Sequence, residues 1–185
     1  MNFRHHLGKL SWTALDKVLF IVYGFVTLIQ IRHLRPEEWG LAAQLVTLQT
    51  WVFIICDGSA LQSIIQFGVD SNDRGRVNFL TLNLVVCIAM GISVAVMLFQ
   101  TPLAMVFNEP RFADVAATLP VFVALTLPRA FALKLLMREL RMRDVFFVDL
   151  AWFGSMAVMT AFMLGNNTFN GYEDMKVISL GGVAC

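Results

Sequence analysis

The sequence predicts an all-α protein, a polytopic membrane helix bundle with five complete spans and an incomplete sixth. Apolar residues make up 58% of the 185 residues, charged residues make up 15%, and the mean hydropathy is +0.70. Soluble domains have about 45–50% apolar and about 25% charged residues. A water-soluble core could not cover this much apolar side chain, so the composition indicates a membrane protein.

The apolar runs have the length and spacing of membrane-spanning helices. A helix needs about 20 mostly apolar residues to cross a bilayer, and the need to satisfy every backbone polar group in hydrocarbon favours helices over open strands. The predicted spans cover residues 11–31, 41–66, 77–99, 115–136 and 145–164, followed by a run at 175–185. Since this last run is too short to span, we expect residues 1–185 to be a fragment of a longer protein.

Positive charges beside the spans predict the orientation, because short cytoplasmic loops are rich in Lys and Arg. With the N-terminus inside, eight such residues lie on the inner side and four on the outer side. The inner set is Arg4, Lys9, Arg74, Arg76, Lys134, Arg138, Arg141 and Arg143, and the outer set is Arg32, Arg35, Arg111 and Lys176. Lys134, Arg138, Arg141 and Arg143 form a predicted cytoplasmic basic face, which either anchors the helix or contacts anionic lipid or lipid-linked phosphate.

Several classes of function find no support in the sequence. The net charge of +1 gives no field for nucleic acid, and the three cysteines lie in apolar runs without metal-type spacing. We therefore expect no metal, no cofactor and no nucleic-acid partner. The histidines are His5, His6 and His33, all near span ends, and they belong to no catalytic motif.

Polar residues within the second span predict a stripe on one helix face. Gln44 and Gln62 are eighteen residues apart, which is five helical turns, and Asp57 follows Gln44 by thirteen residues, nearly on the same face. Together with Thr47 these residues either line a water-filled, sugar-accepting cavity or form hydrogen bonds between helices.

Two cations lie inside the predicted spans, Lys17 and Arg129. Pro128 would kink or break the fourth span, and Arg129 beside it either forms an anion site or extends to the inner headgroups. We expect Asp16 and Asp149 near the inner interface, where they could pair with Lys17 or with the basic face.

Three stretches carry a family resemblance when they are taken in order. They are R-H-L-R-P-E-E-W-G-L-A-A (residues 32–43), D-G-S-A-L-Q-S-I-I-Q (57–66) and T-P-L-A-M-V-F-N-E-P-R-F (101–112). The first resembles the outer loop between helices one and two of Wzx/PST-type oligosaccharide flippases, in the MOP exporter superfamily. Arg35 stands where that family usually has Gly, and Gly58 lies one place early.

The resemblance implies the N-terminal lobe of a two-lobed transporter in the bacterial inner membrane, with its N-terminus in the cytoplasm. The implied cargo is a polyprenyl-pyrophosphate-linked oligosaccharide, turned to the outer leaflet for O-antigen, lipopolysaccharide or other surface polysaccharide biosynthesis. A cavity that accepts pyrophosphate is expected to be cationic, and Lys17 and Arg129 are the cations within spans. The glycan polymerase and other envelope-assembly proteins are implied partners.

Three alternatives remain open at this point. A MATE-like antiporter for small molecules or cations would use buried carboxylates, for which Asp57 and Asp149 are the candidates. A membrane enzyme of envelope glycan assembly would need a catalytic constellation, which the sequence does not display, so we expect no enzyme. A structural or assembly role is the third alternative.

Overall fold

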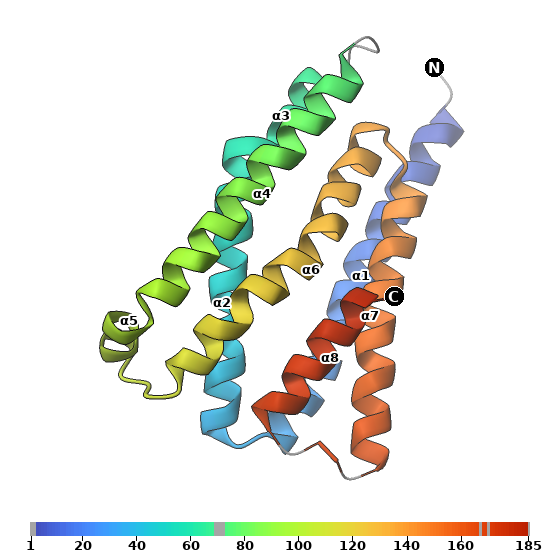
Figure 1. The fold of residues 1–185 in the computed structure, drawn as a ribbon. Helices are drawn as coiled ribbons and strands as arrows, with labels where there is room; N and C mark the ends of the chain where they lie inside the picture. Colours follow the sequence, from blue (N-terminus) through green and yellow to red (C-terminus); the bar gives the residue numbers. More distant parts are fainter. Residues whose placement is uncertain (1–2, 69–72, 167, 170, 185) are drawn as a thin grey trace.

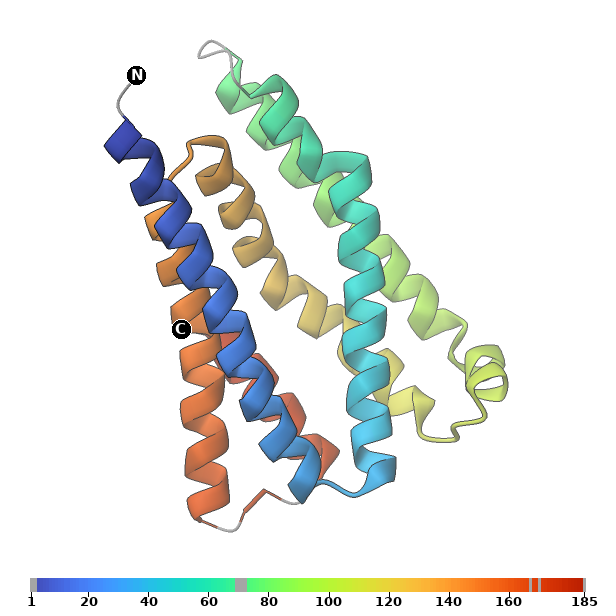
Figure 2. The same cartoon turned by 180° about the vertical axis from the view of Figure 1, so that it is seen from behind.

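The computed structural model of the chain is an up-and-down bundle of helices (Figures 1 and 2). It describes residues 3–68, 73–166, 168–169 and 171–184, without the side chains of residues 3–9 and 179–184. The helices are α1 (Phe3–His33), α2 (Pro36–Cys56), α3 (Gln62–Phe67), α4 (Arg74–Leu98), α5 (Gln100–Phe107), α6 (Phe112–Arg138), α7 (Met142–Gly165) and α8 (Tyr172–Ala184). A π-helical segment, Asp57–Leu61, joins α2 to α3. No strand occurs among the described residues, and the predicted all-α class is confirmed.

Five helical segments within the described residues are long and apolar enough to cross a membrane. They are Leu10–His33, Pro36–Phe67, Arg74–Leu98, Phe112–Arg138 and Met142–Gly165. Each begins before the apolar run that predicted it, because the helix continues into the polar residues beside that run. The side chains of His5, His6, Arg4 and Lys9, together with Cys185, lie outside the described residues.

The connections place the ends of the helices on two sides. Figure 1 shows the N-terminus and the α6–α7 turn at one end of the bundle, with the α1–α2 connection and α5 at the other. Pro36 is the first residue of α2, a position where its missing N–H costs nothing. Leu140 makes the α6–α7 turn with a left-handed backbone, φ 55°, and the N–H of Arg141 donates to the carbonyl of Leu136 at 3.0 Å.

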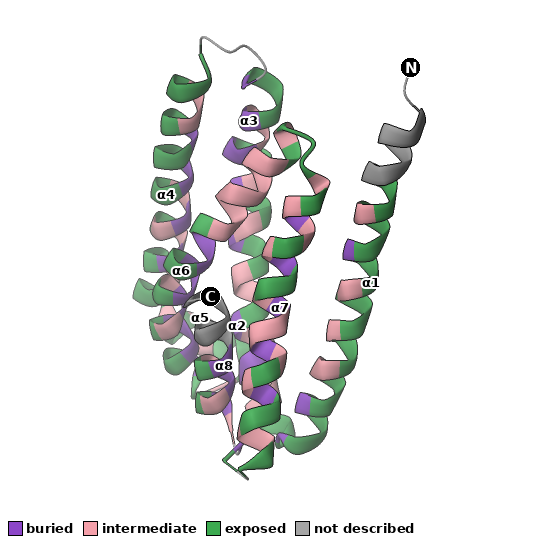
Figure 3. Ribbon diagram, turned by 90° about the vertical axis from the view of Figure 1, so that its right-hand side faces the viewer, coloured by how far each residue is buried: buried purple, intermediate pink, exposed green. Residues whose placement is uncertain are grey.

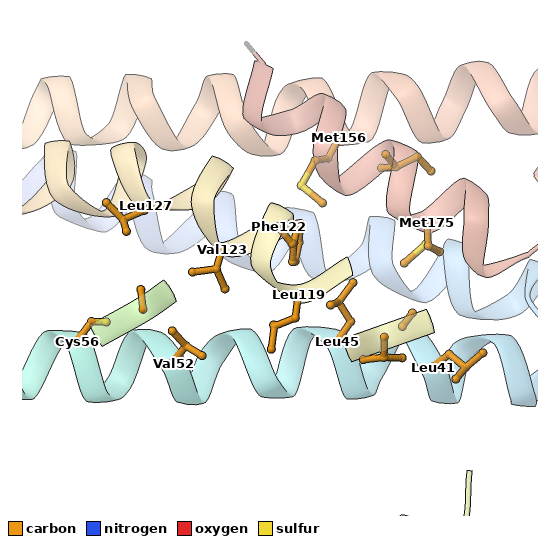
Figure 4. Packing of buried hydrophobic residues seen from close by; sticks show 14 of the residues in the cluster. Leu41, Leu45, Val52, Cys56, Leu119, Phe122, Val123, Leu127, Met156 and Met175 are labelled. Atoms are coloured by element: carbon orange, nitrogen blue, oxygen red, sulfur yellow. The ribbon is translucent and has the colours of Figure 1, made fainter. Parts of the chain in front are cut away.

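The core lies between α2 and α6, with α4, α7 and α8 packed around them. In Figure 4 the side chains of Leu45, Leu119 and Phe122 meet between these two helices, and Met156 and Met175 reach in from α7 and α8. Leu119 and Val123 are fully buried. This central position of α6 brings its polar residues next to both α2 and α7.

Helix α1 packs mainly against α7 and leaves much of its surface uncovered. Figure 3 shows exposed residues along most of its length, including Phe20, Ile21, Phe25 and Leu28. Contiguous exposed apolar side chains of this size would be unfavourable in water. They are the surface that a lipid bilayer covers.

Two spans differ from what the sequence predicts. The second span contains the π-helical segment Asp57–Leu61, which the apolar pattern does not indicate. The fourth span, in contrast, does not break: α6 is continuous with Pro120 and Pro128 inside it. Neighbouring helices and side chains in a membrane bundle can satisfy the backbone groups that a proline leaves free.

Candidate functional site

A cavity of about 700 Å³ opens between α2 and α6 towards the end of the bundle that holds the N-terminus and the α6–α7 turn. We call it the cationic cavity, because Arg129 and Lys134 line it. The other lining residues are Gln49, Thr50, Phe53, Ile54, Asp57, Gly58, Leu61, Thr126, Ala130, Leu133, Met137 and Trp152. The walls are largely apolar, so the two cations and the carboxylate of Asp57 carry most of the specific chemistry.

Lys134 is held by a carboxylate from the neighbouring helix. Its Nζ lies 2.5 Å from Oδ1 of Asp57, the first residue of the π-helical segment. The other carboxylate oxygen, Oδ2, accepts a hydrogen bond of 2.9 Å from Nε2 of Gln62. This pair joins the α2–α3 segment to α6 across the cavity.

Arg129 is held in a different way, by α7. Its Nη2 forms an ion pair with Oδ1 of the buried Asp149, and its guanidinium lies 4.7 Å from the ring centre of Trp152 and 5.8 Å from that of Phe153. Aromatic faces attract cations at these distances. Arg129 therefore faces the bundle interior instead of extending to the headgroups, and Asp149 pairs with it and not with Lys17 or the basic face.

A second cavity, of about 360 Å³, lies next to the cationic cavity towards the opposite end of the bundle. No charged residue lines it among the described residues, and we call it the neutral cavity. Its lining consists of Tyr23, Thr27, Gln30, Trp39, Ala42, Ala43, Val46, Thr47, Gln49, Phe122, Trp152, Met156 and Met175. Gln49 and Trp152 belong to both cavities, so the two spaces adjoin.

Hydrogen bonds fix the polar side chains around the neutral cavity. Nε2 of Gln30 donates to Thr160 at 2.8 Å, and Nε2 of Gln49 donates to Thr126 at 3.1 Å. The Tyr23 hydroxyl donates to the sulfur of Met156 at 3.6 Å. A lining of amides, hydroxyls and aromatic rings suits an uncharged, hydroxyl-rich ligand, because it can hydrogen-bond the hydroxyls and stack on apolar ring faces.

The structure does not bring the predicted polar stripe together. Gln44 and Thr47 line a third cavity, of about 240 Å³, with Trp51, Phe107 and Phe112, whereas Asp57 lines the cationic cavity. The prediction that Asp57 shares the face of Gln44 is wrong. Thirteen residues at about 100° each turn the helix to about 220° from its starting face.

Other predicted residues take separate places. Gln62 donates a hydrogen bond to Asp57, but it is not among the residues that line the cationic cavity. Lys17 lies on the exposed surface of α1, with its side chain 71% exposed and its Nζ 3.8 Å from Asp16. The pairing of Asp16 with Lys17 is thus present, but Lys17 lines none of the three cavities.

The predicted basic face divides into two halves. Lys134 points into the cationic cavity, and Arg138 donates to Oδ1 of Asn78 at 2.9 Å while packing over Gly68. A Cβ at Gly68 would collide with the Arg138 guanidinium and with the carbonyl of Ile64, so this close approach requires glycine. The other half is exposed: Arg141 pairs with Asp144 at 2.5 Å, and Arg143 lies over the ring of Phe147 at 5.6 Å.

Five residues of the two cavities are not among the site residues that the sequence predicts: Tyr23, Gln30, Gln49, Thr126 and Trp152. Each is a single polar or aromatic residue in an apolar run. Thr126 could have been found from the sequence, because it lies on α6 three residues before Arg129 and thus on a similar helix face. For the residues of the other helices, only the packing shows which face is inward.

A comparison with protein families decides what kind of protein this is. The sequence profile of a family described as "Polysaccharide biosynthesis protein" matches residues 29–170. The chain belongs to this family. Membership agrees with the resemblance in the sequence and supports a role in polysaccharide biosynthesis at a membrane. No curated protein and no solved structure showed significant similarity to the chain.

The match of this polysaccharide biosynthesis protein covers α2 to α7 and every residue that lines the cationic cavity. It covers most of the neutral cavity but not Met175, which follows it. It begins within α1 at residue 29, so Tyr23 and Thr27 of the neutral cavity lie before it. Over the described residues, no three His, Cys, Asp or Glu side chains gather closely enough to hold a metal ion.

Proposed function

We propose that this protein takes part in moving a polyprenyl-pyrophosphate-linked oligosaccharide across the bacterial inner membrane for surface polysaccharide assembly. One observation supports the proposal most directly: a cavity with two cations adjoins a cavity with uncharged polar and aromatic residues, and Gln49 and Trp152 line both. The cargo has the same division, because a pyrophosphate is joined to sugars. Following the resemblance, the proposal assigns residues 1–185 to the N-terminal lobe of the transporter.

The placement of the cavities suits a cargo that enters from the cytoplasmic side. In the proposed orientation the N-terminus and the α6–α7 turn face the cytoplasm, and Lys134 lies one to two turns before that turn. A pyrophosphate at the level of the inner headgroups could then meet Lys134 and Arg129. The sugars would extend towards the neutral cavity, deeper in the bundle.

The state of the carboxylates makes antiport of cations the weaker alternative. A coupling carboxylate must offer negative charge to a transported cation or proton, but Asp57 is paired with Lys134 and Asp149 with Arg129. Each pair leaves the cavity without a net negative site. The proposal also treats the protein as a transporter without enzymatic activity, which works beside the glycan polymerase and other envelope-assembly proteins.

Deletion of the gene tests this function. We expect lipid-linked glycan to accumulate in the inner leaflet and surface glycan to fall, and the full-length gene on a plasmid should restore both. The measurement is the accessibility of the lipid-linked glycan to a periplasmic probe, such as a lectin applied to spheroplasts. Normal surface glycan in a deletion strain that has no second exporter would rule out the proposed transport.

A further inference from the structure

The two cations of the cationic cavity have carboxylate partners that differ in their exposure to water. Asp149 has a side chain only 5% exposed, and Arg129 is 24% exposed and stacked on aromatic rings. Separating that pair would strand a charge in the bundle, which is costly. Lys134, at 19%, is no more exposed than Arg129, but its partner Asp57 is 37% exposed. The difference lies in the carboxylates, because that of Asp57 is partly open to water and that of Asp149 is not.

The chemistry of the two basic groups also makes Lys134 the cation that can more easily change its partner. A guanidinium is planar and held by directional contacts, whereas a lysine ammonium is a compact charge on a flexible four-carbon stem. Lys134 can therefore follow an anion that enters the cavity. Asp57 retains one partner if Lys134 leaves it, because Gln62 donates to its other oxygen.

The backbone at Asp57 is also unusual. The π-helical segment Asp57–Leu61 begins at this residue, and Figure 2 shows that the helix changes direction between α2 and α3. π-Helical turns inside α-helices are rare and occur often at functional sites. Gly58, the second residue of the segment, lines the cavity and has open space where a Cβ would lie. The pair of Asp57 with Lys134 thus attaches this irregular segment to α6.

We infer that Asp57 is a displaceable counter-ion of Lys134. When the cavity is empty the carboxylate neutralises the lysine, and a phosphate or pyrophosphate group that enters takes the carboxylate's place. Displacement releases the π-helical segment from α6, so that anion binding loosens the α2–α3 bend. The inference rests on the proposed function for its cargo, but the exchange of one anion for another concerns only these residues.

Binding measurements on the purified full-length protein test the exchange, with inorganic pyrophosphate and a polyprenyl pyrophosphate in detergent micelles as separate probes. Asp57→Asn should tighten binding of each probe by about two- to fivefold, the range that a partly exposed ion pair provides. Lys134→Gln should weaken it at least as much. Binding of the lipid probe alone identifies the lipid headgroup as the source of the anion, and binding of both admits free pyrophosphate.

The matched control is Asp144→Asn, which removes a carboxylate paired with Arg141 near the same end of the bundle but outside the cavity. It should leave both affinities unchanged. Equal tightening by Asp144→Asn would show a general effect of charge and overturn the inference, as would unchanged or weaker binding in Asp57→Asn or no binding by any variant. Asp57→Ser repeats the test if the Asn variant is poorly folded.

Hydrogen exchange tests the mechanical part. Backbone amides of residues 57–62 should exchange faster in Asp57→Asn, and faster in the unaltered protein once pyrophosphate is added. Tighter binding without faster exchange would refute the release of the segment. If the deletion strain keeps normal surface glycan while Asp57→Asn still binds pyrophosphate more tightly, the proposed transport fails and the counter-ion exchange stands.

Discussion

Glu38 illustrates at the residue scale how one side chain can join distant parts of the chain. It lies in the first turn of α2, where a carboxylate complements the positive helix end. Its Oε1 also accepts a hydrogen bond of 2.6 Å from Arg111, before α6, and its Oε2 accepts one of 2.8 Å from the N–H of Tyr172, at the start of α8. The hydrogen bond to Glu38 raises the pKa of Arg111, in keeping with a stabilising contact between the two side chains.

We therefore predict that Glu38→Ala destabilises the protein, whereas Glu37→Ala does not. Glu37 is exposed, but Tyr172 is buried, and a buried N–H left without its acceptor costs about 1–3 kcal/mol. For a chain of this size each kcal/mol lowers the melting temperature by about 2–4 °C. Thermal unfolding of the two purified variants in detergent measures the difference, and equal melting temperatures would contradict the role of Glu38.

The sequence alone could place Glu38 beside the connection between the first two spans, but it could not supply the two partners, which come from residues far along the chain. The same limit separates the candidates in the cavity. Arg129 could be selected because a cation in a span is expensive and faces inward. Asp149, its partner, was visible as a charge, but which cation it meets depends on how α6 and α7 pack.

At the scale of elements, the helices follow the apolar runs closely, because hydrophobic length determines where a helix can cross. The exceptions are local. The π-helical segment Asp57–Leu61 differs from an α-helix only in its hydrogen-bond register, and hydropathy does not record that register. Helix α5, Gln100–Phe107, lies in what the sequence indicates as a connector, since eight residues are too few for a span.

The pair of Arg129 with Asp149 joins α6 to α7, and we predict that Arg129→Gln destabilises the protein. The substitution leaves the buried Asp149 without its cation and beside a second buried carboxylate, that of Asp16 on α1. Breaking one side of a buried pair costs about 3–5 kcal/mol. Arg129→Gln should thus unfold at a clearly lower temperature than Arg143→Gln, a control that alters an exposed arginine of the same basic end.

A double variant separates charge from packing in this pair. Arg129→Gln with Asp149→Asn removes both charges and should recover much of the lost stability, because two neutral side chains can hydrogen-bond to each other. If the double variant is no more stable than Arg129→Gln alone, the aromatic contacts of Arg129 with Trp152 and Phe153 are the larger contribution.

At the scale of the whole molecule, the five long spans alternate in direction, so the connections between them lie on two sides (Figure 1). The α6–α7 turn shares a side with the N-terminus, and the connection after α7 lies on the opposite side. This alternation was predictable from short connectors between apolar runs. Which side faces the cytoplasm depends on the charge difference of eight Lys and Arg against four, because positive residues stay in the cytoplasm.

Two single-cysteine variants test that orientation. Glu139→Cys lies in the α6–α7 turn and Asn166→Cys follows α7, and both positions are exposed; Cys56, Cys87 and Cys185 are first replaced by Ser. In spheroplasts, a membrane-impermeant maleimide should label Asn166→Cys and should reach Glu139→Cys only after the membrane is permeabilised. The reverse pattern would place the N-terminus outside. The cationic cavity would then open towards the periplasm, and a pyrophosphate made in the cytoplasm could not enter it from the inner headgroups.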